Sequence, residues 1–593
     1  MKKLTANKEE IRSKKFFFTF LKNKKDRNLI IILCLPVLLY LQTLSFGFTC
    51  FDDTEIIKDN SAFLSDFRNV PQAFMKDAFL VKHTLSYSGD IFYRPMQTLS
   101  YMFDINLSGR NSTWMFHFTN IMLLGLIACL LYLLLIRLLI PLKLALLSTL
   151  VYCAHPLFIS SITWIPARGD LLLAFFSLWS FLFFIEHLQK KKIKYLLLHW
   201  LTFTLALFCK ETAVILPILF FIYYVAFSSE KRFEKKYLLN IVLYSISGIF
   251  WFWLRSLATG NLSNRTDIGF IPFLSNLRTI PESLANLFLP FDIALIPSFS
   301  LFKTLTGLGI ILLIVVLFFI NKERSKKEKI FCLCWFLLLL LPTLLYKNES
   351  YNYLNHRFFL PLIGILLFIL FVLPKKWFEN ENLKSSWLMI AVFVILSSIT
   401  FVKTRPYSGP ITFYNAAISQ DPHKALLYNN RGYVKVDTGD FQEAIDDFTK
   451  AIALKPNFAL AYNNRGLAYS ALGELESAIK EYDKAIELNP NFPLAYLNRG
   501  NAYRNKGDLT KAIKDYDKAI ELDPNDANAY NNRGNVYYNE GNREMAIKYY
   551  NKAIELDPND ADAYCNRGIA YRDNGILKEA MQDFKMYEKL KKK

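Results

Sequence analysis

The sequence predicts an all-α protein that joins a polytopic membrane helical domain to a C-terminal α-solenoid of short repeats. Two observations lead to this fold class. Hydrophobic residues make up 53% of the 593 residues, and the mean hydropathy is +0.20, which is too apolar for an ordinary soluble protein. After about residue 411 the composition becomes charged and Ala-rich, and a pattern repeats every 34 residues.

The membrane domain is expected over residues 29–403. It follows a basic N-terminal segment, residues 1–28, which has ten Lys and Arg against three acids. Apolar runs long enough for about eleven membrane helices of ~20 residues begin near Leu29, His117, Leu142, Leu171, Tyr195, Thr212, Tyr237, Leu305, Ile330, Phe358 and Trp387. A long polar loop, residues 49–116, separates the first two runs. The first run has no cleavage signal after it and is read as an uncleaved anchor.

Basic residues in the loops predict the orientation. Alternate loops contain Lys or Arg: Arg137–Lys143, Gln189–Lys194, Glu230–Lys236, Lys322–Lys329 and Lys375–Lys384. The positive-inside rule places these loops and the N-terminus in the cytoplasm, and an odd number of crossings places the repeats outside it. The net charge of +19 is thereby explained by topology, so the expected partner is the lipid bilayer and not nucleic acid. The eight cysteines show neither a disulfide framework nor a metal knuckle.

Five copies of Asn-Arg-Gly define the repeats, beginning at Asn430, Asn464, Asn498, Asn532 and Asn566. A glycine follows each copy after seven residues, and a proline precedes each copy by eight. This period and pattern resemble the tetratricopeptide repeat over residues 421–593. Residues 404–420 form a junction that contains part of an earlier repeat. The small residues allow two helices to pack closely, and the proline ends the second helix of each unit.

The repeated asparagines are candidates for binding an acceptor peptide or partner protein. Arrays of this kind present the first helix of each unit on a concave face, where the amides of residues 430, 464, 498, 532 and 566 would form a ladder. An amide both donates to and accepts from a peptide backbone without reading side chains. The alternative, that these asparagines only pack and cap the helices, is equally compatible with the pattern.

Ionisable residues of the membrane domain gather in compact motifs at the expected outer ends of its helices. Acids follow the first apolar run at Asp52 and Asp53, where the competing interpretation is a solvated turn or helix cap. Further motifs are Tyr93-Arg94-Pro95, His117-Phe118-Thr119-Asn120, His155-Pro156, Ala167-Arg168-Gly169-Asp170, Lys210-Glu211-Thr212 and Asn355-His356-Arg357. Their common side of the membrane suggests one site that faces the first outer loop.

The order of these motifs, followed by tetratricopeptide repeats, resembles the transmembrane and tetratricopeptide-repeat O-mannosyltransferases of the GT-C class and their bacterial relatives. Residues 167–172 and 210–212 carry the most specific part of the resemblance. One departure is Gly169, where animal members usually have Ala, and this small-for-small change is expected to cost little. The region 258–302 matches weakly. The resemblance implies transfer of a hexose such as mannose from a polyprenyl-phosphate donor to a hydroxyl group, with protein Ser or Thr as the expected acceptor.

The resemblance also assigns roles. Inverting transfer needs a base for the acceptor hydroxyl and cationic groups for the departing phosphate. Asp52 is the candidate base, Asp53 would orient it or hold a divalent cation (Mg or Mn), and Asp170 is a second acid near the sugar. The candidate phosphate ligands are Arg168, Lys210, His356 and Arg357. Interfacial Lys and Arg often only extend toward water, so a structural role is the alternative for each.

Two other functions fit part of the pattern. A transferase, polymerase or ligase that acts on a cell-surface glycan or lipid also combines membrane helices with external repeats. A non-catalytic scaffold would use the repeats alone and would leave the costly polar residues at the membrane without a role. The sequence favours a bacterial inner membrane over the endoplasmic reticulum as the location.

Overall fold

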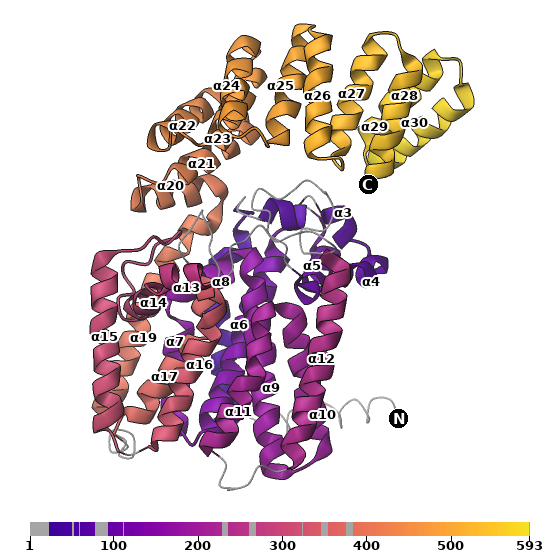
Figure 1. Ribbon diagram of the computed structural model, residues 1–593. Helices are drawn as coiled ribbons and strands as arrows, with labels where there is room; N and C mark the ends of the chain where they lie inside the picture. The colour runs from indigo at the N-terminus through magenta and orange to yellow at the C-terminus, as the bar shows by residue number, and fades with distance from the viewer. Residues whose placement is uncertain are drawn as a thin grey trace, which may run out of the picture. The chain divides into compact units, whose positions relative to one another are not determined.

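The computed structural model describes residues 23–49, 53–58, 60–76, 93–110, 112–227, 235–259, 269–322, 324–345, 354–374 and 383–591. The described chain is helical and contains no strand, which confirms the predicted fold class (Figure 1). It divides into two compact units. The first ends at Gly409, and the helices of the second begin at Pro410.

The first unit is a bundle of apolar helices with short helices at one end (Figure 1). Its elements are α2 (Lys24–Tyr40), η1 (Leu41–Ser45), η2 (Thr54–Lys58), α3 (Ser61–Leu64), η3 (Phe67–Asn69), α4 (Val70–Ala73), α5 (Pro95–Ser108), α6 (Trp114–Arg137), α7 (Leu142–Cys153), η4 (Pro156–Phe158), α8 (Ile159–Thr163), η5 (Ile165–Ala167), α9 (Arg168–Lys190), α10 (Ile193–Cys209), η6 (Glu211–Ile215), α11 (Leu216–Phe227), α12 (Lys235–Thr259), α13 (Phe270–Asn276), α14 (Thr279–Phe288), α15 (Leu301–Ile320), α16 (Lys326–Leu345), η7 (Asn355–Phe358), α17 (Leu362–Val372), α19 (Leu383–Lys403) and η8 (Arg405–Ser408).

The number of candidate membrane helices roughly fits the prediction. In the described residues, seven helices are long and apolar enough to cross a bilayer, and α7 with η4 and α8, bent by 51°, would be an eighth if the pair forms one span. Three shorter apolar segments, Ile193–Cys209, Glu211–Phe227 and Leu362–Val372, correspond to the other predicted crossings. The bend follows Cys153 and includes Pro156, which cannot donate a backbone hydrogen bond.

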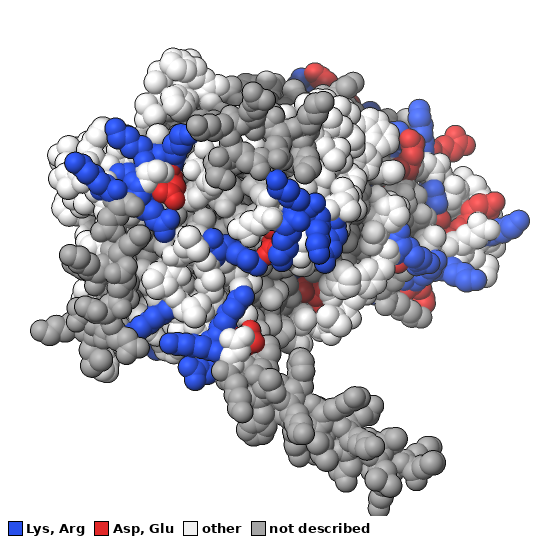
Figure 2. Space-filling view, turned by 90° about the horizontal axis from the view of Figure 1, so that it is seen from below, with Lys and Arg blue, Asp and Glu red and all other residues white. Residues whose placement is uncertain are grey.

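Exposed basic side chains gather at one end of the bundle, as Figure 2 shows from below. They come from the turns α6–α7, α9–α10 and α15–α16: Arg137, Lys143, Lys190, Lys191, Lys192, Lys194, Lys322, Lys326 and Lys327. These turns are three of the five loops that the charge pattern places in the cytoplasm. The two remaining loops, around residues 230–236 and 375–384, lie largely outside the described residues.

Aromatic packing around α9 forms the core of the first unit. Phe181 of α9 contacts Phe220 and Tyr223 of α11 and Trp335 of α16, with ring centroids 5.0 to 5.5 Å apart. Trp335 is 1% exposed and donates to the Leu360 carbonyl at 2.9 Å. This core packs α9 against α11 and α16, and it joins α16 to Leu360, which follows η7.

The second unit consists of α20 followed by five helix pairs. The helices are α20 (Pro410–Gln420), α21 (Ala425–Thr438), α22 (Phe441–Leu454), α23 (Ala459–Ala471), α24 (Leu475–Leu488), α25 (Pro493–Lys506), α26 (Leu509–Leu522), α27 (Ala527–Asn539), α28 (Arg543–Leu556), α29 (Ala561–Asp573) and α30 (Leu577–Lys591). Each pair turns on a glycine with positive φ, such as Gly439 at 86°. A Cβ on Gly432 would lie 2.8 Å from the Phe448 ring, so the close packing within a pair requires glycine.

Candidate active site

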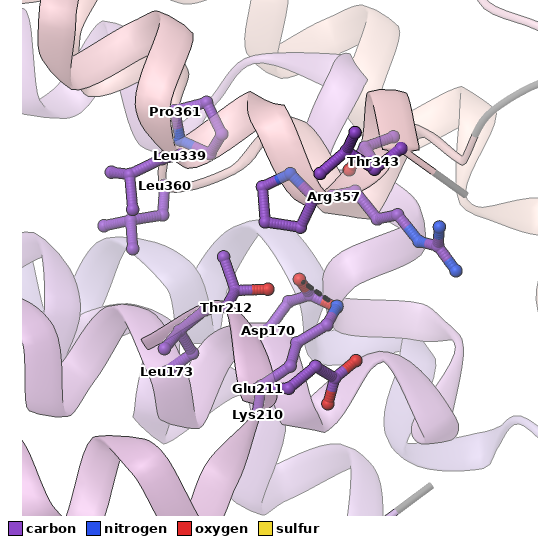
Figure 3. Close-up of a pocket in the computed structure, with 12 residues that line it drawn as sticks. Asp170, Leu173, Lys210, Glu211, Thr212, Leu339, Thr343, Arg357, Leu360 and Pro361 are labelled. Carbon is purple, nitrogen blue, oxygen red and sulfur yellow. Dashed lines mark hydrogen bonds and ion pairs between the residues drawn. The ribbon is translucent and has the colours of Figure 1, made fainter. Parts of the chain in front are cut away.

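Three of the predicted motifs line one cavity of about 230 Å³ in the first unit (Figure 3). Asp170 comes from the first turn of α9, Lys210 and Glu211 from the break between α10 and η6, and Arg357 from η7. The remaining lining residues are mostly apolar: Leu173, Thr212, Leu339, Pro342, Thr343, Leu345, Leu360 and Pro361. The cavity therefore combines a charged end with an apolar wall.

A buried ion pair forms the charged end. The Lys210 ammonium donates to both carboxylate oxygens of Asp170, at 2.7 and 2.8 Å, and the two side chains are 7% and 12% exposed. Lys210 follows the last turn of α10 in extended backbone, with φ −164° and ψ 142°, which turns its side chain toward α9. Lys210 is therefore paired with Asp170 of α9 and not with its sequence neighbour Glu211.

A second acid and two arginines surround this pair. The Glu211 carboxylate is 43% exposed and lies 3.6 Å from the Arg94 guanidinium, which is itself 14% exposed. Arg357 lines the cavity from η7 on the opposite side from Lys210 (Figure 3). Among the described residues at this end of the cavity, three cations accompany two acids, an excess of one positive charge that electrostatically favours an anion.

His356 also approaches the acid, at 3.8 Å from its Nε2 to Asp170 Oδ2. Burial lowers the pKa of His356 to about 3, so the imidazole is neutral near pH 7. The Trp164 ring packs on it with centroids 5.0 Å apart. His356 can therefore supply a hydrogen bond to a phosphate, but not the positive charge that the sequence suggested.

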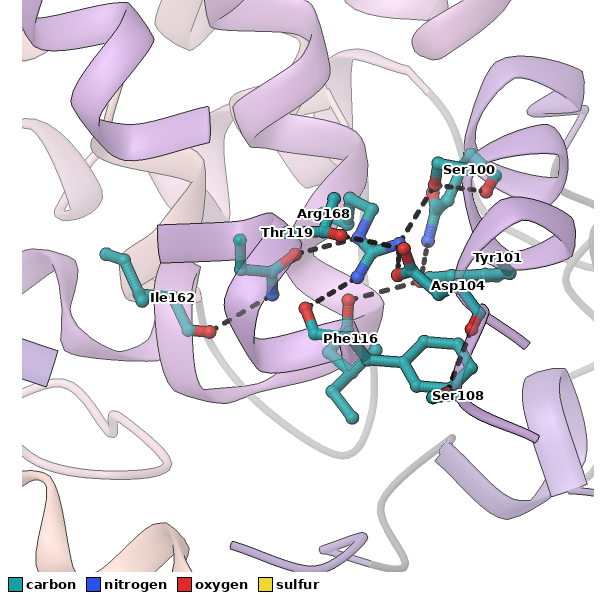
Figure 4. A network of polar contacts seen from close by, with 11 residues as sticks. Ser100, Tyr101, Asp104, Ser108, Phe116, Thr119, Ile162 and Arg168 are labelled. Atoms are coloured by element: carbon teal, nitrogen blue, oxygen red, sulfur yellow. Dashed lines mark hydrogen bonds and ion pairs between the residues drawn. The ribbon is translucent and has the colours of Figure 1, made fainter. Parts of the chain in front are cut away.

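Arg168 does not face the cavity. Its side chain is fully buried and forms an ion pair with Asp104 of α5 at 2.5 Å (Figure 4). It also donates to Asn120 Oδ1 and the Phe116 carbonyl, each at 2.7 Å, and to Ser100 Oγ at 3.2 Å. The predicted contact of Arg168 with a donor phosphate does not fit this geometry, because its donors are already engaged inside the protein.

The first-loop acids are described only in part. Asp52, the predicted base, lies outside the described residues. Asp53 is 1% exposed and accepts hydrogen bonds from the Thr49 amide and hydroxyl, at 2.6 and 2.8 Å. Burial raises the pKa of Asp53 to about 7, although the Thr49 hydrogen bonds oppose this. In the described residues no group of three or more His, Cys, Asp or Glu side chains is arranged to hold a metal.

The repeated asparagines bond to one another between repeats. Asn464 Nδ2 donates to Asn429 Oδ1 at 3.1 Å, and Asn498 Nδ2 donates to Asn463 Oδ1 at 3.0 Å. Asn566 makes the same bond to Asn531, Asn430 accepts from Asn429, and position 497, which would accept from Asn532, is Leu. Asn464 is 3% exposed. This geometry favours the packing alternative over a free amide ladder for binding peptide.

Sequence reasoning missed Asp104 and Gln97 of α5. Both are buried, and they contact the Arg168-Gly169 segment. A Cβ on Gly169 would lie 2.6 Å from Gln97 Oε1, so alanine at this position would displace the Gln97 amide, and its small expected cost stays a prediction. The available signal was the polar face of residues 94, 97, 100 and 104, which are spaced three or four apart as on one side of a helix.

Comparison with known families connects this geometry to a chemistry. Residues 98–253 match the family model of the dolichyl-phosphate-mannose-protein mannosyltransferases. The match runs from α5 into α12 and includes Asp170, Lys210 and Glu211. The tetratricopeptide-repeat model matches four times, at residues 432–473, 469–506, 500–541 and 534–575. The resemblance to GT-C mannosyltransferases with tetratricopeptide repeats is confirmed.

Solved structures match between 28% and 30% of the chain. MamA is 30% identical, with 28% of this chain and 92% of MamA covered at a TM-score of 0.25. YrrB, titled a TPR protein with an unusual peptide-binding site, is 22% identical, with 30% and 91% covered at a TM-score of 0.25. PilF of Pseudomonas aeruginosa is 18% identical, with 28% and 75% covered at a TM-score of 0.27. A search of curated proteins finds no significant match.

Proposed function

We propose that this glycosyltransferase moves a hexose, such as mannose, from a polyprenyl-phosphate donor to a hydroxyl group of an acceptor, with protein Ser or Thr as the acceptor. The observation that carries the proposal is the composition of the cavity. Its Lys210 and Arg357 side chains suit a phosphate, and the apolar wall of Leu339, Leu360 and Pro361 suits the first isoprene units of a lipid.

The residues divide the chemistry among them. A base takes the proton of the acceptor hydroxyl as its oxygen attacks the anomeric carbon, while the bond from that carbon to the phosphate oxygen breaks and polyprenyl phosphate leaves. Lys210 and Arg357 stabilise the charge that develops on the phosphate, and neutral His356 donates a hydrogen bond. The Asp170 carboxylate keeps Lys210 charged and oriented.

The resemblance supplies the remaining roles. It assigns the base to Asp52 and inversion of configuration to the sugar carbon. Asp53 would orient Asp52 or hold a divalent cation, Mg or Mn. Asp53 suits this role only when it is ionised, because its pKa of about 7 leaves the carboxyl half protonated near neutral pH.

The proposed orientation follows the basic end of the bundle. Exposed Lys and Arg side chains at the turns α6–α7, α9–α10 and α15–α16 support a cytoplasmic location for that end. The cavity, at the other ends of the same helices, then faces outward, where sugars are supplied on lipid carriers. The repeats would lie on this outer side of a bacterial inner membrane and bind the acceptor or a partner protein. Because four of the five repeated asparagines bond to other asparagines, other side chains of the repeats would carry most of that binding.

A purified transfer assay tests the proposal. The full chain in nanodiscs is given radiolabelled mannosyl polyprenyl phosphate and a Ser/Thr-rich polypeptide. Arg357→Gln should lower kcat/KM for the donor by about 10- to 100-fold, the equivalent of a charged hydrogen bond worth ~1.5–3 kcal/mol. Lys143→Gln, at the opposite end of the bundle, is the matched control and should retain wild-type activity. Equal activity of the two variants would remove Arg357 from donor binding.

A further inference from the structure

One face of α5 docks on the start of α9. The face carries Gln97, Ser100 and Asp104, which are spaced three and four residues apart, and Arg94 immediately precedes the helix. Ser100 and Asp104 contact Arg168, the first residue of α9. Gln97 lies over Gly169, the second. The contact therefore runs along the helix residue by residue, toward the cavity.

Arg168 is the centre of this contact. Its guanidinium joins α5, through Asp104 and Ser100, to α6, through Asn120 and the Phe116 carbonyl (Figure 4). It also packs on the Tyr101 ring, 4.8 Å from the ring centroid. A fully buried guanidinium needs such partners, because an unpaired charge there would be strongly unfavourable. The pair with Asp104 therefore holds α5 against α9.

Glycine at position 169 allows the Gln97 side chain to lie close to the start of α9. Gln97 Oε1 lies 2.6 Å from where a Cβ would be, and the Arg94 Cδ lies 3.8 Å from it. The Gln97 amide is anchored by its donations to Tyr101 Oη at 2.7 Å and to the Pro166 carbonyl at 2.9 Å. A methyl group at position 169 would therefore displace the Gln97 amide from these partners and loosen the contact between α5 and α9.

The first turn of α5 leads directly to the cavity. Arg94 lies against Gly169, next to Asp170, and its guanidinium is 3.6 Å from Glu211, which lines the cavity. We propose that Asp104 and Arg168 are positioning residues that hold Arg94 at the cavity, where it contributes to binding the phosphate group of the donor. The phosphate part of this inference rests on the proposed function.

An alkylation experiment tests the positioning without any ligand. In the full chain in nanodiscs, Arg94→Cys is allowed to react with a maleimide, and modification of its peptide is followed by mass spectrometry. Adding Asp104→Asn should speed the modification several-fold, because α5 loosens and exposes position 94. Gly169→Ala should also speed the modification, while it leaves the ion pair between Asp104 and Arg168 intact. It provides the same test if Asp104→Asn does not fold. An unchanged rate in the folded variants would overturn the inference.

A binding experiment tests the role of Arg94 through epistasis. The Kd for polyprenyl phosphate, measured against polyprenol of equal length, should rise about tenfold in Arg94→Gln and in Asp104→Asn, equivalent to ~1.4 kcal/mol. The double variant should be no weaker than Arg94→Gln, since Asp104 acts through Arg94. Additive losses would overturn the inference. A wild-type protein that binds both lipids equally would instead refute phosphate binding and the proposed function, while the alkylation result still decides the positioning.

Discussion

The ion pair between Asp170 and Lys210 allows stability and catalysis to be separated. Both side chains are almost completely buried, and the Lys210 ammonium contacts both carboxylate oxygens. Lys210→Met removes one partner and leaves Asp170 as an uncompensated charge. Breaking a buried pair in this way typically costs ~3–5 kcal/mol, whereas replacing both partners by apolar residues is often close to neutral. The double variant Asp170→Leu with Lys210→Met should therefore be more stable than Lys210→Met alone.

Activity should not follow this recovery. Lys210 is proposed to stabilise the departing phosphate, so transfer should fall by at least about a hundredfold in the single and the double variants alike. Thermal unfolding of detergent-purified protein reports the first effect, and the transfer assay reports the second. If the double variant is as unstable as Lys210→Met, the uncompensated Asp170 charge is not the cause of the instability. If the double variant regains transfer, Lys210 has no role in catalysis.

Three further predictions follow from individual contacts. Asn464→Ala should lower the unfolding temperature of the repeats, because it leaves the buried Asn429 amide oxygen without its donor, at a typical cost of ~1–3 kcal/mol. Asn532→Ala, at the break in the ladder, should change the unfolding temperature little. Equal effects of the two substitutions would contradict the asparagine ladder. Asp53 should make stability fall as the pH rises from about 4 to 7, because in this window its carboxyl, with a raised pKa, holds a proton in the native state that it has lost in the unfolded chain. Asp53→Asn should flatten this pH dependence of the unfolding temperature in thermal scans. Because burial lowers the pKa of His356 to about 3, its imidazole should stay neutral between pH 6 and 8 and should not make donor binding depend on pH. His356→Gln, which puts a neutral amide donor in place of the imidazole, should therefore keep the wild-type pH profile of the Kd for the donor. A pH profile that changes with this substitution would show that His356 titrates in this range.

Much of the fold could be predicted because its signals are periodic or long. Apolar runs long enough to span a bilayer need only composition and length, and all of the predicted crossings have a counterpart in the structure. The repeats were equally clear, because glycine and proline recur at positions where a positive φ or a helix end requires them. The close packing of the two helices in each repeat also explains why glycine recurs at position 432 and its equivalents, since a Cβ there would meet an aromatic ring.

The site was only partly accessible from the sequence. The motifs of Asp170, Lys210 and Arg357 are compact, and their convergence could be inferred from topology. The role of Arg168 could not, because its partner Asp104 lies 64 positions away on a separate helix. The asparagines show the same limit. Their period was evident, but whether an amide faces a groove or the neighbouring repeat depends on side-chain direction, which the 34-residue spacing does not encode.

The most direct test of the account is transfer of sugar by the purified chain. Full-length protein in nanodiscs, mannosyl polyprenyl phosphate and a Ser/Thr-containing polypeptide should yield a glycopeptide detectable by mass spectrometry, with release of an equal amount of polyprenyl phosphate. Lys210→Met should abolish both products, while Lys143→Gln should leave both unchanged. Transfer that proceeds equally well in Lys210→Met would contradict the assignment of the cavity as the active site. Transfer to a glycan or lipid acceptor, with none to polypeptide, would contradict the proposed acceptor.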